Sequence, residues 1–349
     1  MRITPHGFCF IRRFLVMEIK VKKKKKTYPV ILERGILRKA SEYISSKGRV
    51  FLVSDDGVPE TWRALLQRQY PEAHMHVFPQ GEPSKNMDTL KNLLEDMAEH
   101  QVARNDTVVA LGGGVVGDLA GFAASVYKRG ISYVNIPTTT LSQIDSSIGG
   151  KTAVDLAGVK NLVGAFWQPD AVLVDTDVLA TLPARHFSNG LAEAVKEGLT
   201  FDERLFAIFE KDDYADHIDD IIYRCLMIKK GVVERDEREE GERKLLNFGH
   251  TIGHAYEASH GLAEYLHGEC VGMGMLAIMD DPALKERLKA VLQRLNLPIR
   301  CDNDKEEVFR LLRNDKKASH DRITIVQVDE IGKGYLKEVE IDSLREKLI

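Results

Sequence analysis

Four of the 11 histidines of this 349-residue chain lie in one stretch of 23 residues, from Asn247 to Glu269. Within it, His250 and His254 are four residues apart, a spacing that puts two imidazoles on one face of a helix and can chelate zinc. The residue after His250 is Thr251, so the glutamate base of an HExxH metalloprotease is missing. Spacing alone therefore supports a metal site and an ordinary polar helix face about equally.

A helix through residues 243–257 would gather further polar groups on the histidine face. At about 100° per residue, five side chains fall within about 80° of one another: Arg243, Asn247, His250, His254 and Glu257. A solvated face normally mixes Lys, Glu and Gln, whereas this one combines imidazole, amide and guanidinium groups. A catalytic zinc site needs three protein ligands and an open position. The third ligand would be His267 in "LHGE" or Glu193 in "LAEAVKEG", with His260 as a bystander.

Two glycine-containing segments suggest a site for phosphate groups. Three glycines in "VVALGGGVVGDLAGF" follow a predicted buried strand and precede a helix of small residues, whose N-terminal N–H groups could meet a phosphate. The pattern does not match GxGxxG, so a tight turn is an equally good interpretation. Glu82 and Lys85 lie three residues apart at a predicted helix start, where they could bind ribose hydroxyls and a phosphate, although a helix cap also explains them.

Residues 143–169, "QIDSSIGGKTAVDLAGVKNLVGAFWQP", are rich in glycine and lack regular periodicity. We expect a long ordered loop, because its apolar residues argue against disorder and long loops in compact domains are commonly functional. Lys151 and Lys160 are then candidates for binding a phosphate or a carboxylate, although a single lysine is more often simply solvated.

The elements that must position these residues fall into two groups. In the first half, runs rich in Val and Ile predict strands at 49–56, 74–79, 106–114, 132–137 and 171–176. Helical periodicity lies between them, at 61–70 and 87–100. This alternation predicts an α/β layer with parallel strands. After Pro183 helical spacing dominates, at 191–199, 219–233, 249–258, 282–295 and 305–315, and 322–328 resembles a late strand or hairpin. We therefore expect a domain boundary near Pro183.

Length and composition limit the classes of protein that fit. A chain of 349 residues with 44% hydrophobic residues is expected to form two domains, or one large domain with a satellite. A formal net charge of -4 gives no global attraction to nucleic acid or to a membrane, so neither partner is expected and any anion must meet a local cluster. No apolar run is long enough to span a bilayer. The scattered cysteines, Cys9, Cys225, Cys270 and Cys301, argue against a thiolate zinc site or a disulfide framework and favour the reducing cytoplasm.

The N-terminal segment makes a poor signal peptide. Its apolar stretch is interrupted by Arg12 and Arg13 and has no cleavage site, and Met17 opens a more ordinary start, so we interpret residues 1–16 as an extension. The lysine run Lys22–Lys26 abuts a β-branched segment. It predicts a solvated edge strand rather than a nucleic-acid patch, because lysine on an edge discourages pairing between sheets.

Together, six segments in colinear order resemble the 3-dehydroquinate synthase family: residues 112–130, 136–154, 160–169, 234–257, 266–269 and 314–317. The similarity extends from about Met17 to the C-terminus. It implies a Rossmann-like α/β NAD-binding domain over residues 17–183 and an all-α metal- and substrate-binding domain over 184–349, with the active site between them. Each motif is weak by itself, whereas six in order are specific.

The resemblance also implies an activity. Members of the family convert 3-deoxy-D-arabino-heptulosonate 7-phosphate to 3-dehydroquinate and phosphate in the shikimate pathway. They oxidise the C5 hydroxyl transiently with NAD, eliminate phosphate, return the hydride, open the ring and close a carbocycle by aldol addition. The implied cofactors are NAD and one divalent metal, Zn²⁺ or alternatively Co²⁺, and the implied assembly is a homodimer.

Carried over residue by residue, the resemblance implies three metal ligands, Glu193, His250 and His267, and makes His254 a proton-handling neighbour. Catalytic roles fall to His254, Lys151, Lys229, Arg243 and Asn247. Substrate contacts are implied for Arg129, Asp145, Lys151, Asn161, Lys229, Arg243, Asn247 and one of Lys316 or Lys317. NAD contacts are implied for Asp55, Glu82, Lys85, Gly113, Gly114, Val115, Asp118, Thr138, Thr139, Lys151, Lys160, Val178, Leu179, Ala180 and Thr181.

The chain departs from the family in one place and leaves three alternatives. After "HGECVGMGMLAIM" the helical connection is shorter than usual, with Asp280, Asp281 and Pro282 marking a tight turn. One alternative is a cyclase making 2-epi-5-epi-valiolone or 2-deoxy-scyllo-inosose, but Arg243, Asn247 and Lys229 favour a substrate with a carboxylate. The others are a metal-dependent NAD polyol dehydrogenase, which would turn over NAD, and a binding protein without activity.

Overall fold

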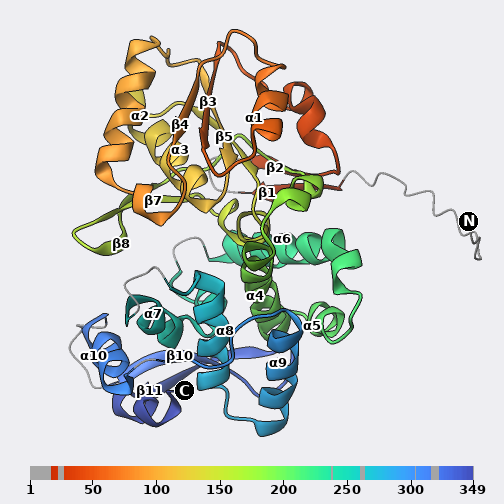
Figure 1. Ribbon diagram of the computed structural model, residues 1–349, viewed down its shortest axis with the longest axis vertical. Helices are drawn as coiled ribbons and strands as arrows, with labels where there is room; N and C mark the ends of the chain where they lie inside the picture. Colours follow the sequence, from red (N-terminus) through yellow and green to blue (C-terminus); the bar gives the residue numbers. More distant parts are fainter. Residues whose placement is uncertain are drawn as a thin grey trace, which may run out of the picture.

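The computed structural model describes residues 17–22, 27–236, 239–259, 264–302, 304–315 and 322–348 (Figure 1). Seven strands form one sheet in the order β1-β2-β9-β6-β5-β3-β4. Their bounds are β1 (Met17–Lys22), β2 (Thr27–Leu32), β3 (Val50–Asp55), β4 (Met75–Phe78), β5 (Thr107–Gly112), β6 (Ser132–Pro137) and β9 (Ala171–Val174). β1 and β2 are antiparallel, whereas the other pairs are parallel. The predicted parallel α/β layer is therefore confirmed.

The central strands of this sheet are buried on both faces. In β3, Phe51 and Val53 pack toward α2 (Met87–Glu99) and α3 (Gly114–Val126), whereas Leu52 packs on the other face with Leu66 of α1 (Glu60–Gln67). Alternate residues of a strand point to opposite faces, so a parallel strand covered by helices on both sides is apolar throughout. β1 lies at the sheet edge, as the lysine run predicted, and Lys23–Lys26 lie outside the described residues.

The prediction of a long loop over residues 143–169 is wrong for most of its length. Two antiparallel strands, β7 (Lys151–Leu156) and β8 (Val159–Phe166), form a hairpin there. Val163 and Ala165 pack against the cluster of buried residues under α3, whereas Leu162 and Phe166, on the alternate face, are exposed. Gly164, which lies between the apolar residues of the two faces, and Lys160 and Asn161 before them concealed the alternation. The hairpin projects from the sheet half of the molecule toward the helical half (Figure 1).

The second half is mainly helical, as predicted. Its helices are α4 (Ala184–Phe201), α5 (Glu203–Phe209), α6 (Ile218–Arg235), α7 (His250–Ser259), α8 (His267–Ile278), α9 (Pro282–Arg294) and α10 (Lys305–Asp315). The predicted late strand is β10 (Arg322–Val328), which pairs with β11 (Gly334–Glu340). Among the described helices, none combines the length and apolar character needed to cross a bilayer. We propose Pro183, immediately before α4, as the boundary between domains at 17–183 and 184–349.

The short connection between α8 and α9 is a capped turn. The Asp281 side chain accepts a hydrogen bond from the Leu284 N–H at 2.8 Å, and Pro282 occupies the first position of α9. Asp280 accepts a hydrogen bond from Gln327 Nε2 at 3.1 Å and forms an ion pair with Lys347. The turn is thus attached to β10 and to the end of the chain.

Helix α8 packs so closely on its neighbours that some of its glycines leave no room for a side chain. A Cβ atom at Gly274 would lie 2.1 Å from the carbonyl oxygen of Gly249, whereas a Cβ at Gly272 would lie 3.2 Å from the flexible end of Leu292. We expect Gly274→Ala to lower the free energy of unfolding by about 1–3 kcal/mol, because backbone must move to make room. Urea unfolding measures this, with Gly272→Ala as the matched control in the same helix. Equal losses in both variants would contradict the close approach.

Candidate active site

Three side chains from three helices meet in the second half of the molecule. Glu193 lies in α4, and His250 and His267 are the first residues of α7 and α8. Glu193 Oε1 lies 3.5 Å from His250 Nε2 and 3.4 Å from His267 Nε2, and the ligand atoms of all three lie within 4.8 Å of one another. Glu193 is 1% exposed, and its Oε1 accepts no hydrogen bond within the described part of the chain. A buried carboxylate oxygen that faces two imidazole nitrogens fits a divalent metal.

Neighbouring groups orient these ligands. His250 Nδ1 lies 3.2 Å from the Phe248 carbonyl oxygen, and His267 Nδ1 lies 3.5 Å from Glu257 Oε2. Engaging Nδ1 directs Nε2 of each ring toward the shared centre, as in many metal sites. Burial lowers the pKa of His250 to about 3, which favours the neutral, ligating imidazole.

The expectation of one helix through residues 243–257 is wrong in its first half. Residues Glu242–Asn247 form a separate 3-10 helix, and α7 begins only at His250. Gly249, with φ 79°, makes the break, and Met275 of α8 packs directly against it. His254 lies one turn after His250 and is exposed, with its ring centroid 5.3 Å from that of His250.

His254 belongs to a different group of metal-ligating side chains from His250. It shares the second group with Glu257 and His267. Its ring centroid lies 5.9 Å from that of His267. Spacing alone allowed His250 and His254 to chelate one metal. The structure instead groups His250 with the buried Glu193 and with His267.

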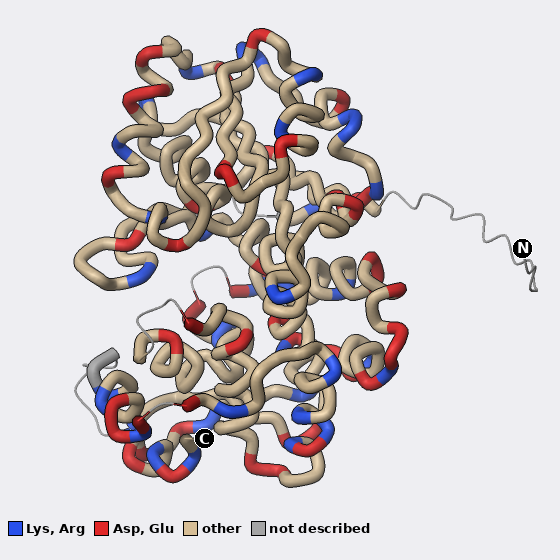
Figure 2. The backbone as a smooth tube through the Cα atoms, in the orientation of Figure 1, with Lys and Arg blue, Asp and Glu red and all other residues tan. Residues whose placement is uncertain are grey.

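Cationic and amide side chains gather near the three ligands. Lys229 Nζ donates to the carbonyl oxygen and to Oδ1 of Asp145, each at 2.5 Å. Lys151 forms an ion pair with Glu239, whose Oε1 also accepts a hydrogen bond from Asn247 Nδ2 at 2.5 Å. The charged residues of both signs are interspersed over the molecule, so this grouping is local (Figure 2).

Arg243 and Glu239 complete this group. A Cβ at Gly149, which has φ 105°, would lie 2.8 Å from Arg243 Nη2, so the guanidinium packs on the glycine backbone. Burial raises the pKa of Glu239, but hydrogen bonds from Lys151 and Asn247 outweigh burial and hold it below the usual value. Sequence reasoning missed Glu239 as a site residue, although it lies within the acidic run "ERDEREEGER".

The residues predicted to contact NAD collect at one edge of the sheet. Asp55 ends β3, Gly113 and Gly114 follow β5, Thr138 and Thr139 follow β6, and Val178 to Thr181 follow β9. These four strands are parallel and adjacent, so their carboxyl ends share one edge, where open α/β sheets bind ligands. Gly114 opens α3, with Val115 next to it, and the helix N-terminus is a site for anions.

Two lysines extend this edge toward the metal-ligating group. Lys85 Nζ lies 2.5 Å from Asp118 Oδ2 and 2.5 Å from Asn161 Oδ1. Lys160 Nζ lies 2.6 Å from Glu257 Oε1 and 3.7 Å from Glu82 Oε1. Because Glu257 also contacts His267, Lys160 connects the sheet half with a candidate metal ligand.

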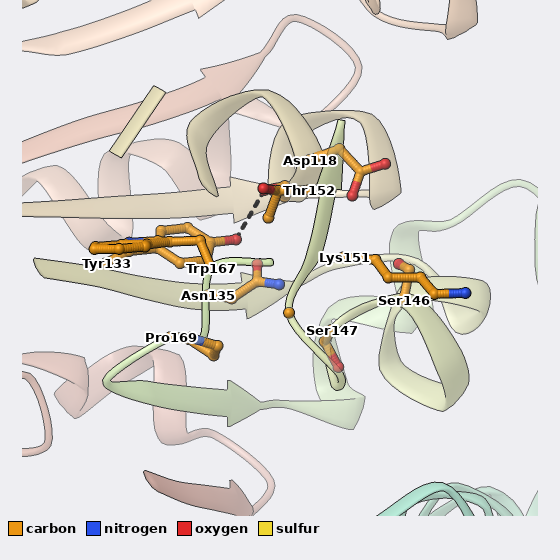
Figure 3. A pocket seen from close by; sticks show the side chains of 11 residues that line it. Asp118, Tyr133, Asn135, Ser146, Ser147, Lys151, Thr152, Trp167 and Pro169 are labelled. Carbon is orange, nitrogen blue, oxygen red and sulfur yellow. Dashed lines mark hydrogen bonds between the residues drawn. The ribbon is translucent and has the colours of Figure 1, made fainter. Parts of the chain in front are cut away.

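A pocket lies beside α3, β6 and β7 (Figure 3). The pocket is small, and both Asp118 and Lys151 line it. Tyr133 closes one side, and its hydroxyl donates to the Gly117 carbonyl oxygen at 2.9 Å. The pocket thus adjoins one residue predicted for NAD and another predicted for both ligands.

One predicted contact, Arg129, is not brought to this group. Arg129 follows the C-terminal end of α3 and is exposed with φ 67°, and it forms no hydrogen bond or ion pair with other described residues. Asp118 lies near the opposite end of α3, about 12 Å along the helix from Val126 at 1.5 Å per residue. Lys316 and Lys317 lie outside the described residues.

Comparisons with known proteins show which families and relatives this chain is similar to. Residues 75–189 match the family described as 3-dehydroquinate synthase N-terminal, and residues 190–318 match 3-dehydroquinate synthase C-terminal. The 3-dehydroquinate synthase of Clostridium kluyveri is 40% identical, covering 90% of this chain and 93% of its own. That of Clostridium acetobutylicum is 42% identical, covering 90% and 94%.

Solved structures resemble the whole chain. A 2-deoxy-scyllo-inosose synthase complexed with carbaglucose-6-phosphate, NAD⁺ and Co²⁺ has a TM-score of 0.86 at 25% identity, covering 95% of this chain and 100% of its own. The 2-epi-5-epi-valiolone synthase of Streptomyces hygroscopicus subsp. jinggangensis 5008, with NAD⁺ and Zn²⁺ bound, has a TM-score of 0.84 at 27% identity, covering 93% and 97%. A glycerol dehydrogenase of Schizosaccharomyces pombe, at 16% identity and a TM-score of 0.62, shares the fold alone.

Proposed function

This chain belongs to the 3-dehydroquinate synthase family, and we propose that the residues gathered around Glu193 and Lys151 are the active site for that family's reaction. The enzyme converts 3-deoxy-D-arabino-heptulosonate 7-phosphate to 3-dehydroquinate and phosphate in the shikimate pathway, which leads to chorismate and the aromatic amino acids. It is an NAD- and metal-dependent carbon–oxygen lyase. The observation that carries our assignment is the group of Glu193, His250 and His267 beside several cationic side chains.

Glu193, His250 and His267 hold the divalent metal, and Zn²⁺ is the best match. Two imidazoles and one carboxylate with an open fourth position are a known catalytic zinc donor set, and Co²⁺ is the alternative. The related cyclase structures bind NAD⁺ with Zn²⁺ or with Co²⁺, which supports both choices. When bound, the metal supplies Lewis acidity at the substrate hydroxyls, and NAD accepts and then returns a hydride.

The protein's own side chains bind and orient the substrate. Lys151, Lys229 and Arg243 supply positive charge for a ligand that carries both a phosphate and a carboxylate, and Asn247 donates amide hydrogen bonds. The Glu239 carboxylate contacts both Lys151 and Asn247. An anionic group of the bound substrate takes the place of this carboxylate beside the two side chains. Asp145 orients Lys229, and Asn161 adjoins both ligands from the hairpin.

His254 moves a proton rather than binding the metal. It is exposed and lies one helical turn beyond His250, where it can exchange protons with solvent. NAD lies along the carboxyl edge of the sheet, with its pyrophosphate at Gly113, Gly114 and Val115. The cytoplasmic location that we also propose rests on the four scattered cysteines, which show no CxxC spacing and no disulfide framework in the sequence.

Phosphate release from 3-deoxy-D-arabino-heptulosonate 7-phosphate, with NADH absorbance followed in the same cuvette, tests the function. We expect stoichiometric phosphate and no net NADH, because a cyclase returns its hydride. EDTA should abolish the release and Zn²⁺ should restore it. Net NADH formation would indicate a polyol dehydrogenase. Turnover only of sugar phosphates without a carboxylate would indicate one of the other cyclases.

A homodimer would explain the position of Arg129. Leu162 and Phe166 expose 55% and 56% of their surface on one face of β8, and Val126 at the end of α3 exposes 44%. Leu162 and Phe166 lie on the same face of β8, and neighbouring exposed apolar side chains of this size are typical of an interface. We assign this face to a second copy of the chain, with Arg129 directed to the partner's substrate. Lys316 or Lys317 would complete the phosphate contacts.

Mixing two inactive variants tests this assignment. One carries Arg129→Ala and the other Lys151→Ala, and the two are unfolded and refolded together. If Arg129 acts on the partner's site, we expect about a quarter of wild-type activity, since half of the dimers are mixed and each has one intact site. Refolding each variant alone is the control. If the mixture is no more active than the separate variants, Arg129 acts within its own chain or has no contact with substrate.

A further inference from the structure

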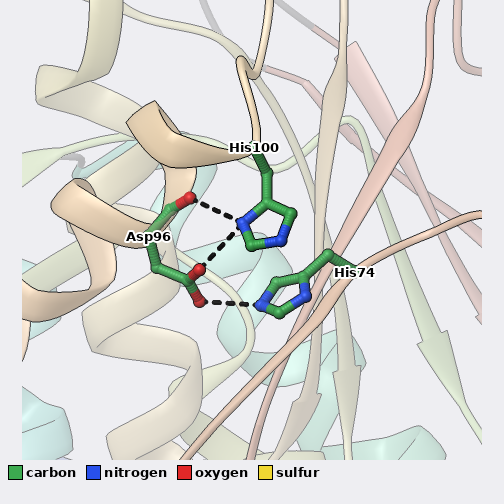
Figure 4. A group of neighbouring side chains, drawn as sticks. All are labelled: His74, Asp96 and His100. Carbon is green, nitrogen blue, oxygen red and sulfur yellow. Dashed lines mark hydrogen bonds and ion pairs between the residues drawn. The ribbon is translucent and has the colours of Figure 1, made fainter.

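A second group of histidines lies beside β4 and α2, in the sheet half of the molecule and away from α7 and α8 (Figure 1), and Figure 4 draws it from close by. His74 comes immediately before β4, and Asp96 and His100 lie at the C-terminal end of α2. His74 Nε2 lies 2.9 Å from Asp96 Oδ2, and His100 Nδ1 lies 2.9 Å from Asp96 Oδ1. Their ligand atoms all lie within 4.8 Å of one another.

The two imidazoles are aligned toward the same carboxylate. The rings of His74 and His100 stack with centroids 3.6 Å apart and planes inclined by 16°, and the ring of Phe51 lies 5.5 Å and 6.3 Å from them. Asp96 and His100 are four residues apart on a helix, a spacing that points both side chains to one side. Each ring thus presents a nitrogen to Asp96, as Figure 4 shows.

A third histidine fixes the carboxylate from the buried side. His76 Nδ1 lies 2.6 Å from Asp96 Oδ2, and His76 and Asp96 expose only 15% and 19% of their side chains. His74 and His100, by contrast, expose 36% and 42%, so the outer side of the group is open to solvent. In many metal sites, a residue outside the ligand set holds a ligating carboxylate in place by a hydrogen bond. His76 is positioned to do this for Asp96, which leaves His74 and His100 accessible.

The electrostatic surroundings favour a cation. The group lies at the C-terminal end of α2, where the free carbonyls give the helix its partial negative charge. Imidazole nitrogen with a single carboxylate suits zinc, copper or nickel, whereas magnesium and calcium prefer oxygen donors.

We propose that His74, Asp96 and His100 bind a divalent transition metal, with Zn²⁺ the best match, at a site separate from the active site. His76 orients Asp96, and water completes the coordination on the exposed side. The ion would attach the edge strand β4 to the end of α2, two elements that lie at the margin of the sheet. Its role is structural, because His74 precedes the amino end of β4, whereas the residues predicted to bind NAD follow the carboxyl ends of the strands.

The competing explanation is that Asp96 only accepts hydrogen bonds from neutral imidazoles. Metal content distinguishes the two. The holoenzyme is equilibrated with Zn²⁺, freed of excess metal by gel filtration and analysed for zinc per chain. We expect two equivalents in the wild type and one in His100→Gln and in Asp96→Asn. His217→Gln, a change in another surface histidine paired with an aspartate, is the matched control and should keep two.

His250→Gln separates the two sites, because it is expected to remove the active-site metal alone. In this background Zn²⁺ should still raise the melting temperature, and adding His100→Gln should abolish that rise. Wild-type turnover in the His100→Gln single variant shows that the variant has folded. One equivalent in the wild type, or two in both His100→Gln and Asp96→Asn, would overturn the proposal and leave the hydrogen-bonded interpretation.

Discussion

Glu193→Gln is expected to lower the rate of phosphate release by about 10³-fold or more and to remove the active-site metal from the purified enzyme. The amide keeps the shape of the side chain but loses the negative charge that faces His250 and His267. It also leaves Lys196, which forms a buried ion pair with Glu193, without its counter-charge. An uncompensated buried charge is strongly destabilising, so the variant should also unfold at a lower temperature.

Glu269→Gln is the control for this change. Glu269 is also a buried acid, at 4% exposure, and it lies two residues after His267, but its partners are Arg185 and the Leu266 N–H. We expect this variant to lose some stability and to keep both its metal and its turnover. A Glu193→Gln enzyme that retained stoichiometric metal and activity would remove Glu193 from the ligand set.

Arg243→Lys is expected to reduce kcat/KM by about 10²- to 10³-fold, in line with the roughly 2–5 kcal/mol lost when a buried charge pair is broken. Lysine keeps the positive charge but not the planar fork that binds a carboxylate with two hydrogen bonds. Arg243 is 3% exposed and packs on Gly149, so water cannot replace the hydrogen bonds that lysine fails to make. Steady-state kinetics with the heptulosonate substrate measure the effect.

Lys244→Met is the neighbouring control, because it removes a positive charge from the same 3-10 helix. It should leave kcat/KM unchanged. NAD binding and metal content of Arg243→Lys should match the wild type, which separates loss of substrate contact from a general loss of structure. If Arg243→Lys were as active as Lys244→Met, the carboxylate-binding role would belong to another residue, and the preference for a carboxylated substrate would lose its main support.

Much of the fold follows from local sequence patterns. The predicted strands at 49–56, 74–79 and 132–137 correspond to β3, β4 and β6 within two residues at each end, and the predicted helix at 305–315 is α10. Parallel strands buried on both faces read as apolar runs, and amphipathic helices repeat every three or four residues. Both signals are carried by neighbouring residues, so they need no tertiary information.

Only part of the active site could be predicted from local sequence patterns. Spacing pointed to His250 and His254, whereas the group around Glu193 emerged from the resemblance of six motifs. No spacing rule places Glu193 beside His267, because α4 and α8 are brought together by packing along a glycine-bearing face. A Cβ at Gly268, for example, would lie 1.9 Å from the Asn189 carbonyl oxygen.

The sequence by itself determined the order of the elements, the apolar faces they bury and the residue types available for chemistry. The tertiary structure decided where the helix before His250 breaks, that β7 and β8 form a hairpin, that Glu239 holds Lys151, and that His74 meets His100. The physical reason is that periodicity records the local backbone, whereas contacts between distant residues depend on how whole elements pack. Gly249 shows this, because its left-handed φ and its contact with α8 both become visible only in three dimensions.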